Sequence, residues 1–382
     1  MKLTILLYSL GAGGAERITS LLLEELCKEY EITLVLLEDI LHYPLPKEVK
    51  KIILGKNKMQ ENGIKKLLKI PFLAYKYSKI LKDSTHSLSL MNRPNYINIL
   101  ASFLAKKPKI FISERSFPSE QYGYKNLNSK INKFLIKTLY PFAYKISANS
   151  PQTLQDLQEN FKIHEKKLTF LPNLFNLTKI EQLSKENTQE KNLVLQKKKE
   201  GKFIFLNIGR LDCGKNHALL IESFSKLKQK DKAHLFIIGA GELKNKLEEQ
   251  ISTLGLKNHI SLLGALKNPY APLSCADCFV FASNHEGFPN VLVESLALGV
   301  PIITTDCAPK MILECKEDFL QSSKISKCGI TVPLGDTLQM YMAMDKVMQE
   351  PLFIQENIKE SAKRFSLPHL LPLYKQWLEI NL

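Results

Sequence analysis

Two parallel-sheet α/β domains are the fold that this sequence predicts, because one pattern of apolar runs and glycine loops occurs twice. The apolar run 2–8 leads into a glycine-rich loop, then a segment of helical spacing at 15–29 and a second apolar run at 32–37. This order is typical of a β-loop-α-β unit, and the pattern restarts at residue 203. We therefore expect two Rossmann-like, doubly wound domains whose loop edges face each other across a ligand cleft.

The second copy begins with the apolar run 203–208, a polar loop and helical spacing at 217–228, and continues with the run 234–239 and a glycine turn. A helical segment is expected after each of four further strands, at 259–263, 279–283, 301–305 and 329–332.

A polar, highly charged stretch at 181–202 lies between the two copies. It has little to bury, so we place the linker there and expect domains at 1–185 and 200–364. The amphipathic segment 365–382 is expected to pack on a domain surface, and the first domain is one candidate.

Charge is unevenly distributed along the 382 residues, whose formal net charge is +15. Residues 1–190 hold 29 Lys and Arg against 18 Asp and Glu, whereas residues 191–382 hold 24 against 20. The first half is therefore expected to face an anionic partner.

Other compositional features exclude several classes of protein. No run of roughly 18 uncharged apolar residues is present, and the short start predicts a strand rather than a signal peptide. The seven cysteines are scattered, which predicts a reduced, cytoplasmic chain. Cys275 and Cys278 form a lone CxxC without a second pair, so no metal site is expected.

The most specific motif is Glu286-Gly-Phe-Pro-Asn-Val-Leu-Val-Glu294, after the expected strand 279–283. Pro289 and Asn290 suit a helix start, which puts Glu286 in the loop and Glu294 just over one turn into the helix. Each carboxylate can accept two hydroxyl hydrogen bonds, as a ribose or sugar ring offers, and the helix start suits a phosphate. Spacing alone leaves a solvated helix residue as an equal alternative for Glu294.

A second polar loop, Gly209-Arg-Leu-Asp-Cys-Gly-Lys-Asn216, follows the strand 203–208. Parallel strands end at one edge of a sheet, so Arg210 and Lys215 are expected beside the two glutamates. A nucleoside diphosphate needs such cations, and needs them more as it departs and charge builds up. Two exposed surface cations are the alternative for this loop taken alone.

Four motifs together resemble glycosyltransferase family 4 over essentially the whole chain: GGAER (13–17), GRLDCGKN (209–216), GAGE (239–242) and EGFPNVLVE (286–294). The resemblance implies the GT-B fold and a retaining transferase that needs no metal and no cofactor. It also implies that the N-terminal domain faces the acceptor and the membrane, while the C-terminal domain binds a UDP-sugar donor.

The resemblance further implies roles for individual residues. Arg210 and Lys215 would bind the donor diphosphate, Glu294 the ribose and Glu286 the transferred sugar, which makes Arg210, Lys215 and Glu286 the catalytic candidates. The donor-binding candidates are Gly13, Gly14, Arg210, Lys215, Glu286, Gly287, Phe288, Pro289, Asn290 and Glu294.

The family account is front-face attack, in which the leaving phosphate helps to take the acceptor's proton. The sequence has no Asp-x-Asp metal motif, which agrees with this account. One departure is Arg115, which stands where many family members have a histidine near the donor sugar. Arginine cannot shuttle a proton at neutral pH, and the neighbouring Glu114 is only a weak substitute.

Two basic segments are candidates for contact with an anionic membrane. Residues 50–82 hold ten lysines and one glutamate, and residues 125–145 hold five lysines and no acid, both interleaved with apolar and aromatic residues. The alternative is that the apolar residues are core. Nucleic acid is excluded as a partner because no recognition motif is present.

A polyprenyl-diphosphate-linked saccharide would combine phosphates for the lysines with a chain for the bilayer. The segments 8–17, 90–101 and 209–221 resemble family members that move N-acetylgalactosamine (GalNAc) from UDP-GalNAc, in α-1,4 linkage, onto undecaprenyl-diphosphate oligosaccharides for bacterial protein N-glycosylation. Such an enzyme would work at the inner face of the cell membrane. The acceptor candidates are Glu16, Asn92, Arg93, Asn95 and Arg115.

Rival interpretations remain at this stage. Another UDP-sugar could serve lipopolysaccharide or capsule assembly, and an epimerase of the same fold or a non-catalytic membrane-binding relative would share many motifs. A dinucleotide-dependent oxidoreductase is disfavoured, because Glu16 stands where the third glycine of G-x-G-x-x-G is needed.

Overall fold

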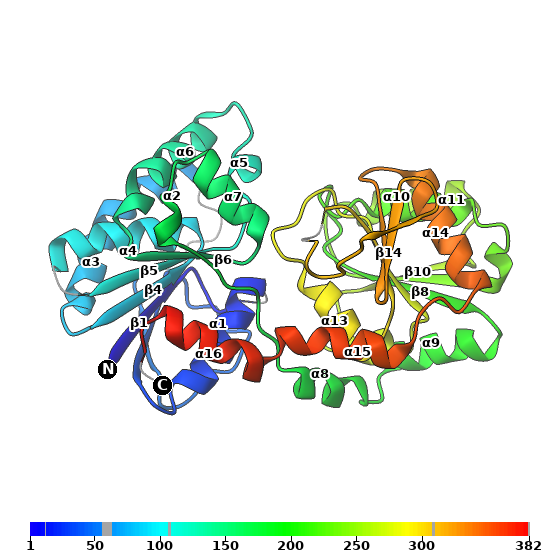
Figure 1. Ribbon diagram of the computed structural model, residues 1–382, viewed down its shortest axis with the longest axis horizontal. Coiled ribbons are helices and arrows are strands. Elements are labelled where there is room, and N and C mark those ends of the chain that lie inside the picture. The colour runs from blue at the N-terminus through cyan, green and yellow to red at the C-terminus, as the bar shows by residue number, and fades with distance from the viewer. Residues whose placement is uncertain (12, 56–62, 106–107, 308–309, 381–382) are drawn as a thin grey trace. The chain divides into compact units, whose positions relative to one another are not determined.

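The computed structural model describes residues 1–382 except 12, 56–62, 106–107, 308–309 and 381–382. The chain forms two compact units (Figure 1). Unit 1 comprises Met1–Phe175 and Leu367–Leu382, and unit 2 comprises Asn176–Ser366.

Unit 1 is built on a seven-stranded, all-parallel sheet in the order β3-β2-β1-β4-β5-β6-β7. Its strands are β1 (Lys2–Leu7), β2 (Glu31–Leu36), β3 (Lys50–Ile53), β4 (His86–Leu90), β5 (Lys109–Glu114), β6 (Lys145–Ala148) and β7 (Leu168–Phe170). The strand order reverses between β1 and β4, and ligands of doubly wound sheets bind at the carboxyl ends of the strands at such a point.

The helices of unit 1 connect these strands and cover the sheet. They are α1 (Gly14–Leu26), α2 (Gly63–Leu68), α3 (Ile70–Leu81), α4 (Asn92–Ala105), α5 (Pro118–Gln121), α6 (Leu127–Leu139), α7 (Pro151–Glu159) and α16 (Leu367–Trp377). Helix α1 fits its predicted segment because Ile18, Leu22 and Leu26 recur at helical spacing and are buried.

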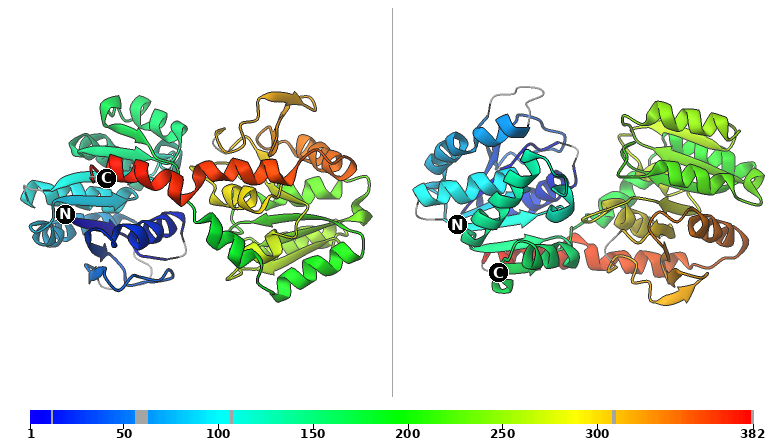
Figure 2. Two further views of the ribbon diagram at one scale, coloured as in Figure 1. Left: turned by 60° about the horizontal axis from the view of Figure 1, so that its bottom comes forward. Right: turned by 90° about the horizontal axis from the view of Figure 1, so that it is seen from above.

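The last helix of the chain, α16, belongs to unit 1 and lies against it in both views of Figure 2. The ring of Trp377 meets the ring of Phe111 edge-on at 5.2 Å, and Lys375 pairs with Glu29 at 2.6 Å. Beyond the helix, Glu379 pairs with Lys109 and Lys145 and accepts a hydrogen bond from Tyr144. These partners, Lys109 first, lower the pKa of Glu379 to about 2.

Unit 2 is built on an eight-stranded sheet in the order β10-β9-β8-β11-β12-β15-β14-β13. Its strands are β8 (Phe203–Ile208), β9 (Ala233–Ile238), β10 (Ile260–Gly264), β11 (Cys278–Phe281), β12 (Ile302–Thr305), β13 (Glu317–Phe319), β14 (Ser323–Ser326) and β15 (Gly329–Val332). Its helices are α8 (Leu177–Ser184), α9 (Gln189–Lys199), α10 (His217–Ser225), α11 (Lys244–Thr253), α12 (Tyr270–Leu273), α13 (Asn290–Leu298), α14 (Thr337–Gln349) and α15 (Gln355–Ala362).

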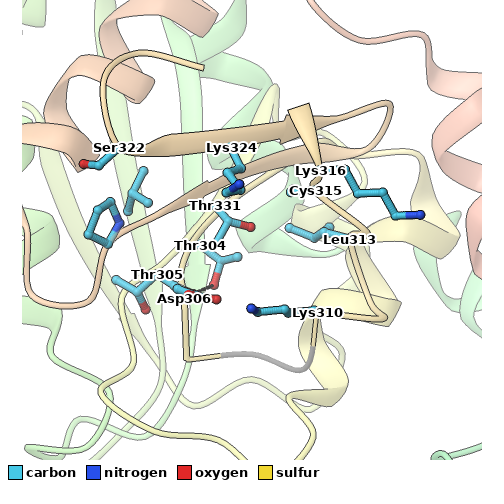
Figure 3. A pocket seen from close by; sticks show the side chains of 12 residues that line it. Thr304, Thr305, Asp306, Lys310, Leu313, Cys315, Lys316, Ser322, Lys324 and Thr331 are labelled. Atoms are coloured by element: carbon cyan, nitrogen blue, oxygen red, sulfur yellow. Dashed lines mark hydrogen bonds between the residues drawn. The ribbon is translucent and has the colours of Figure 1, made fainter. Parts of the chain in front are cut away.

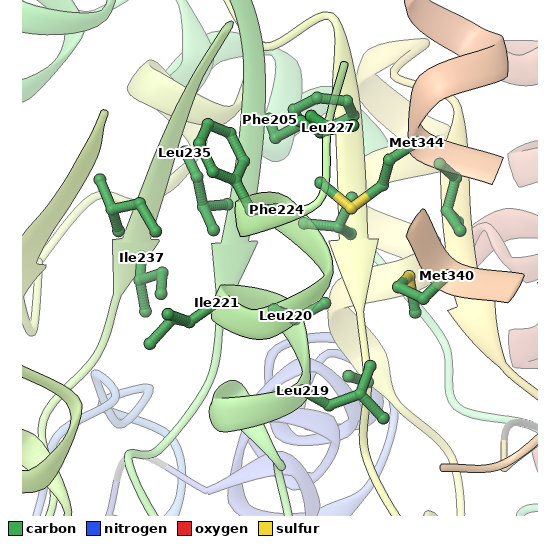
Figure 4. Close-up of a cluster of buried hydrophobic side chains, with 14 of the residues drawn as sticks. Phe205, Leu219, Leu220, Ile221, Phe224, Leu227, Leu235, Ile237, Met340 and Met344 are labelled. Carbon is green, nitrogen blue, oxygen red and sulfur yellow. The ribbon is translucent and has the colours of Figure 1, made fainter. Parts of the chain in front are cut away.

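The core of unit 2 lies between this sheet and its covering helices (Figure 4). Phe224 of α10 meets Phe205 of β8 edge-on, while Met340 and Met344 enter the same cluster from α14. All four of these side chains are fully buried. The sheet and the helices therefore bury apolar area against each other that neither layer could bury alone.

Two details differ from the sequence predictions. The stretch expected to be the linker forms α8 and α9 of unit 2, because Ile180 and Val194 give these polar helices enough apolar surface to pack against α12. No helix follows β12 among the residues described there. The chain instead adds the antiparallel strands β13 and β14, which extend the sheet beyond β15. The fold class itself, two parallel-sheet α/β domains, is confirmed.

Candidate functional site

Two loops of unit 2 that are about 70 residues apart in the sequence are joined at the carboxyl edge of the sheet. Strands β8 and β11 are parallel neighbours, so the loops that follow them leave at one edge. Asn284 joins these loops through its main-chain N–H, which donates to Gly214 O at 2.8 Å, and its side chain, which donates to Cys213 O at 3.0 Å. Its Oδ1 also accepts from Asn216 at 3.1 Å. The β8 loop therefore has a fixed position against the β11 loop.

Lys215 and Glu286 form an ion pair across these two loops. Their side chains are 22% and 13% exposed, and the Lys215 ammonium also lies 5.5 Å from the centroid of the Phe281 ring. A cation and a carboxylate in this partly buried setting interact more strongly than they would at an exposed surface. The structure thus brings together two of the three residues that the sequence assigns to catalysis.

Arg210, the third of these residues, is oriented differently. Its side chain is 82% exposed, and one guanidinium nitrogen lies 3.4 Å from Asp212. A guanidinium that is this accessible and only loosely paired keeps most of its five N–H donors for another partner.

The glycines of the loop after β9 let its backbone pack closely against the backbone of the loop after β8. A Cβ on Gly239, whose φ is 154°, would overlap the carbonyl oxygen of Gly209, and a Cβ on Gly241 would overlap the backbone of Leu211. Main-chain hydrogen bonds run from Gly209 N to Ile238 O and from Leu211 N to Ala240 O. Only residues without side chains allow this close stacking of two backbones.

Helix α13 starts at Asn290, as its sequence predicts, and places Glu294 in its second turn. Glu294 is 6% exposed and accepts from the Tyr270 hydroxyl at 3.5 Å. It is therefore not a solvated helix residue. Phe288 and Pro289 are buried, and Phe288 packs edge-on against Phe365.

His217 lies against Gly209 of the β8 loop and was not among the expected site residues. Its side chain is 1% exposed, and neither ring nitrogen has a hydrogen-bond partner among the residues that the structure describes. Burial lowers its pKa to about 4, so the imidazole is neutral at pH 7.

In unit 1, the residues that follow β1 surround the start of α1. Gly13 is the N-cap of this helix, and the carboxylate of Glu16 occupies the space where a Cβ on Gly13 would lie. Burial raises the pKa of Glu16, which is half-buried. Arg17 follows and lies over the ring of Phe175, with its Cζ 5.3 Å from the centroid.

A second cationic group follows β4, next to β1 in the sheet. Met91, with a φ of 72°, turns the chain sharply into α4, a conformation that a residue with a side chain adopts rarely. The guanidinium of Arg93 lies 5.7 Å from the centre of the Tyr8 ring, and Lys66 lies 5.2 Å from the same ring. Tyr8 follows β1, so these groups gather where the strand order reverses.

Asn92 and Asn95, two of the expected acceptor contacts, make hydrogen bonds inside unit 1. Both side chains are buried, and both donate to the hydroxyl of Tyr140. Asn92 also donates to Glu114 at 2.9 Å. Their polar atoms hold the interior of unit 1 together, which spacing along the sequence did not reveal.

Glu114 is the centre of this buried network. Its side chain is fully buried and accepts hydrogen bonds from Asn92 and Tyr140 on one oxygen, and from the main-chain N–H groups of Arg115 and Ser116 on the other. Burial raises its pKa above the ordinary value, although the hydrogen bonds from Tyr140, Ser116 and the main chain of Arg115 offset part of this rise. A carboxylate enclosed in this way holds a loop in place and has no access to a substrate, so Glu114 is not a substitute base.

Arg115 follows the carboxyl end of β5, and its side chain is half-buried. Its Nη1 donates to Asn173 Oδ1 at 2.8 Å, and its Nη2 donates to the hydroxyl of Tyr374 at 3.3 Å. Its Nε–H is buried, so one further N–H on each of Nη1 and Nη2 is left for a ligand, at the same edge of the sheet as Arg17 and Arg93.

The two basic segments of unit 1 contain strand β3 and the helices α2, α3 and α6, while residues 56–62 lie outside the described part of the chain. In α3, Leu73 and Tyr77 are buried, whereas Phe72 and Tyr75 are 60% and 53% exposed. Lys76 and Lys79 lie over these two exposed rings. In α6, Phe134 is 65% exposed.

Helices α3, α4 and α6 pack in sequence into one layer (Figure 1). The exposed residues of this layer, here called the basic aromatic face, are Phe72, Tyr75, Phe103, Leu104, Leu127 and Phe134, with Lys76 and Lys79. Among the described residues, no helix is long and apolar enough to cross a bilayer.

A cavity of about 410 Å³ lies at the carboxyl ends of β12 and β15 (Figure 3). Lys310, Lys316 and Lys324 line it together with Asp306, so its charge favours anionic ligands. None of the residues that the sequence assigned to donor or acceptor binding lines this cavity. Among the described residues there is also no group of three or more His, Cys, Asp or Glu side chains placed to hold a metal ion.

Comparison with known proteins identifies the family. A family model described as glycosyl transferases group 1 matches residues 188–364. N-acetylgalactosamine-N,N'-diacetylbacillosaminyl-diphospho-undecaprenol 4-alpha-N-acetylgalactosaminyltransferase of Campylobacter jejuni is 43% identical over 307 residues, which cover 80% of this chain and 80% of that protein. The chain belongs to the group 1 glycosyltransferases.

Two further relatives agree with this assignment. The C. jejuni GalNAc-alpha-(1->4)-GalNAc-alpha-(1->3)-diNAcBac-PP-undecaprenol alpha-1,4-N-acetyl-D-galactosaminyltransferase is 29% identical. The match covers 100% of this chain and 98% of that protein. The crystal structure of Anabaena Alr3699/HepE in complex with UDP has a TM-score of 0.79 at 16% identity, and the match covers 99% of this chain and 100% of that one. The likeness to the Anabaena structure shows that this chain has the fold of GT-B glycosyltransferases.

Proposed function

We propose that this glycosyltransferase moves GalNAc from UDP-GalNAc, in α-1,4 linkage, onto an undecaprenyl-diphosphate-linked oligosaccharide for protein N-glycosylation. The observation that carries the donor site is the convergence of Lys215 and Glu286 from two loops at one sheet edge. The sugar, the linkage and the lipid carrier are taken from the names of the two C. jejuni relatives.

In this proposal the donor opens the ion pair between Lys215 and Glu286. A β-phosphate oxygen replaces the carboxylate as the partner of Lys215, and the released Glu286 accepts hydrogen bonds from hydroxyls of the transferred sugar. Exposed Arg210 closes on the diphosphate, and buried Glu294 accepts the ribose hydroxyls. Gly287 and the start of α13, including Asn290, contribute main-chain N–H groups to the phosphates.

The proposed reaction retains the configuration at the anomeric carbon and needs no metal. The bond between that carbon and the β-phosphate oxygen breaks, and the acceptor oxygen forms a bond on the same face. The acceptor's proton passes to the departing phosphate, which leaves as UDP. Arg210 and Lys215 stabilise the charge that develops on this phosphate, a role that a metal ion fulfils in other transferases.

The acceptor's diphosphate is proposed to bind at the carboxyl edge of the sheet of unit 1. Arg93 and Arg115, from the loops after β4 and β5, would donate to its oxygens, and Arg17 from the start of α1 adds a third cation. Glu16 would move away from Gly13 so that the backbone there can approach a phosphate or a sugar, as proposed for Gly13 and Gly14.

The basic aromatic face is proposed to rest on anionic lipid at the inner face of the cell membrane. Exposed rings such as Phe72 would enter the headgroup region while the lysines contact lipid phosphates. Sedimentation with vesicles tests this directly. We expect binding to phosphatidylglycerol-containing vesicles that falls with salt, and at least a threefold loss for Phe72→Ser combined with Phe134→Ser. Equal binding to neutral vesicles would contradict the proposal.

The test of the reaction is a transfer assay without added metal and with a chelator present. Labelled UDP-GalNAc and UDP-GlcNAc are supplied separately with a polyprenyl-diphosphate saccharide in detergent. Label that reaches lipid only from UDP-GalNAc, in an α-linkage by NMR, supports the whole proposal. Transfer only from UDP-GlcNAc would overturn the sugar assignment, and dependence on added Mg²⁺ or Mn²⁺ would overturn the metal-free mechanism.

A further inference from the structure

Tyr374 of α16 contacts Arg115 from a position more than 250 residues further along the chain. The hydroxyl of Tyr374 is buried and donates its single hydrogen to the carbonyl of Pro172 at 2.9 Å. Its lone pairs therefore face the guanidinium, which donates to them from Nη2. The direction of both hydrogen bonds is set by this chemistry.

Asn173 is the second partner of the guanidinium. Its Oδ1 accepts from Nη1 of Arg115 at 2.8 Å, and its side chain is 3% exposed. Two acceptors on two different nitrogens fix the plane of the guanidinium as well as its position, because the group is rigid and flat. Two of its five N–H donors are used in this way and the Nε–H is buried, which leaves the second N–H of Nη1 and of Nη2 for a ligand.

The main chain of Arg115 is held separately from its side chain. Glu114 accepts from the N–H groups of Arg115 and Ser116, and Tyr140 and Asn92 hold Glu114 in turn. In the described part of the chain, none of Glu114, Tyr140 and Asn92 makes a hydrogen bond to Tyr374. Removing the Tyr374 hydroxyl should therefore leave the loop after β5 where it is, while it releases the guanidinium of Arg115 and the carbonyl of Pro172.

We propose that Tyr374 is a positioning residue for acceptor binding: the C-terminal helix holds the Arg115 guanidinium in the orientation that receives a phosphate of the acceptor. This inference rests on the proposed role of Arg115 in acceptor binding. It assigns α16 a role in acceptor recognition, although this helix lies far from Arg115 in the sequence.

The variant Tyr374→Phe tests this proposal, with Glu379→Gln as a matched control on the same C-terminal segment. Both variants remove hydrogen bonds that dock the segment on unit 1, but only the first touches Arg115. With full-length protein, UDP-GalNAc and a polyprenyl-diphosphate saccharide, we expect Tyr374→Phe to raise the acceptor KM about tenfold, with the donor KM unchanged. We expect Glu379→Gln to lower the melting temperature and to leave both KM values unchanged.

A purely structural role for Tyr374 would give a different pattern. The two variants would then lose activity in proportion to their loss of stability, with no selective change in the acceptor KM. That outcome, or a Tyr374→Phe enzyme with the wild-type acceptor KM, would overturn the inference.

A double-mutant cycle with Arg115→Ala separates this inference from the proposed function. If Tyr374 acts through Arg115, Tyr374→Phe has no further effect on the acceptor KM in the Arg115→Ala background. An equal effect in both backgrounds would overturn the positioning role. An Arg115→Ala enzyme with a normal acceptor KM would overturn the proposed role of Arg115 itself, and a wild-type protein without transfer activity would overturn the proposed function.

Discussion

The two units carry polar residues at the same edge of similar sheets, yet they fix these residues by different means. In unit 2 the β8 and β11 loops are joined directly, by Asn284 and by the pair of Lys215 with Glu286, and are supported by glycine backbones. In unit 1 the loop after β5 is held from behind, by buried Glu114, Tyr140 and Asn92.

This difference has a physical basis in what each site is proposed to bind. A nucleoside diphosphate needs close approach of backbone and exchangeable ion pairs, which glycine loops and a partly exposed Lys–Glu pair provide. An arginine that must present a fixed plane to a lipid-linked phosphate is better served by a rigid, buried support. The comparison predicts that the stability of unit 2 depends on its glycine backbones, and that the stability of unit 1 depends on its buried hydroxyls.

The largest effect is expected for Gly239→Ala in unit 2. The new Cβ would overlap the Gly209 carbonyl at a φ of 154°, so we expect the free energy of unfolding to fall by about 4 kcal/mol or more. Gly201→Ala is the control, because its φ is 78° but no atom lies within 4 Å of the added Cβ, and it should cost about 1 kcal/mol. Urea unfolding measures both, and equal losses would contradict the stacked-backbone account.

The next largest effect is expected for Lys215→Ala, measured as transfer. Loss of the cation proposed to face the departing phosphate should lower kcat about 100-fold to 1,000-fold, which corresponds to about 3–4 kcal/mol of transition-state stabilisation. The exposed Lys226→Ala, whose partner Glu222 lies on the same helix, should leave kcat unchanged. A Lys215→Ala enzyme within threefold of wild type, still folded by circular dichroism, would remove Lys215 from the donor site.

An intermediate effect is expected for Tyr140→Phe in unit 1. The lost hydroxyl accepts from Asn92 and Asn95 and donates to Glu114, so three buried polar groups lose a partner, at a cost of about 3 kcal/mol. Tyr77→Phe removes one recorded hydrogen bond, to Ser87, and should cost about 1 kcal/mol. Calorimetry compares them, and an equal cost would mean that the network around Glu114 adds little.

The smallest effect for a single side chain is expected at acid pH, from the buried histidines of unit 2. Burial lowers the pKa of both His217 and His234 to about 4, below the usual 6.5. Between pH 6.5 and 4 the unfolded chain therefore binds protons that the folded chain does not, so stability falls as the pH falls, by about 2 kcal/mol for each histidine. His217→Leu should reduce this loss of stability at low pH, whereas His42→Gln, at an exposed residue, should not. Urea unfolding at pH 7 and 4.5 gives the free energy of unfolding of each variant. An equal loss in both variants would contradict the neutral state of buried His217.

Much of unit 2 could be predicted from the sequence because its signals are local. The strands β8 and β15 have the predicted bounds, and α13 begins at Asn290 after the proline that suits a helix start. Parallel strands end at one edge, so the meeting of the Lys215 loop with the Glu286 loop follows from strand order alone. Asn284, which joins the loops, was missed although it lies two residues before Glu286.

The acceptor side could not be predicted as well, because its chemistry depends on distant contacts. The polar run at Asn92 and Asn95 suggested ligand contacts, yet Tyr140 and Glu114 bury these amides inside unit 1. Nothing local in the sequence links Arg115 with Tyr374, and the chain after β12 gave no sign that antiparallel strands would replace a helix.

The sequence by itself determined the two α/β domains, the donor motifs and the basic character of the first half. These depend on periodicity, on glycine positions and on composition, all of which act over a few residues at a time. Only the tertiary structure decided which polar side chains face a ligand and which support the fold. That choice depends on burial and on hydrogen-bond partners far apart in the chain, such as Arg115 with Tyr374 and Glu114 with Tyr140, because a polar group's role is set by whether water or protein surrounds it.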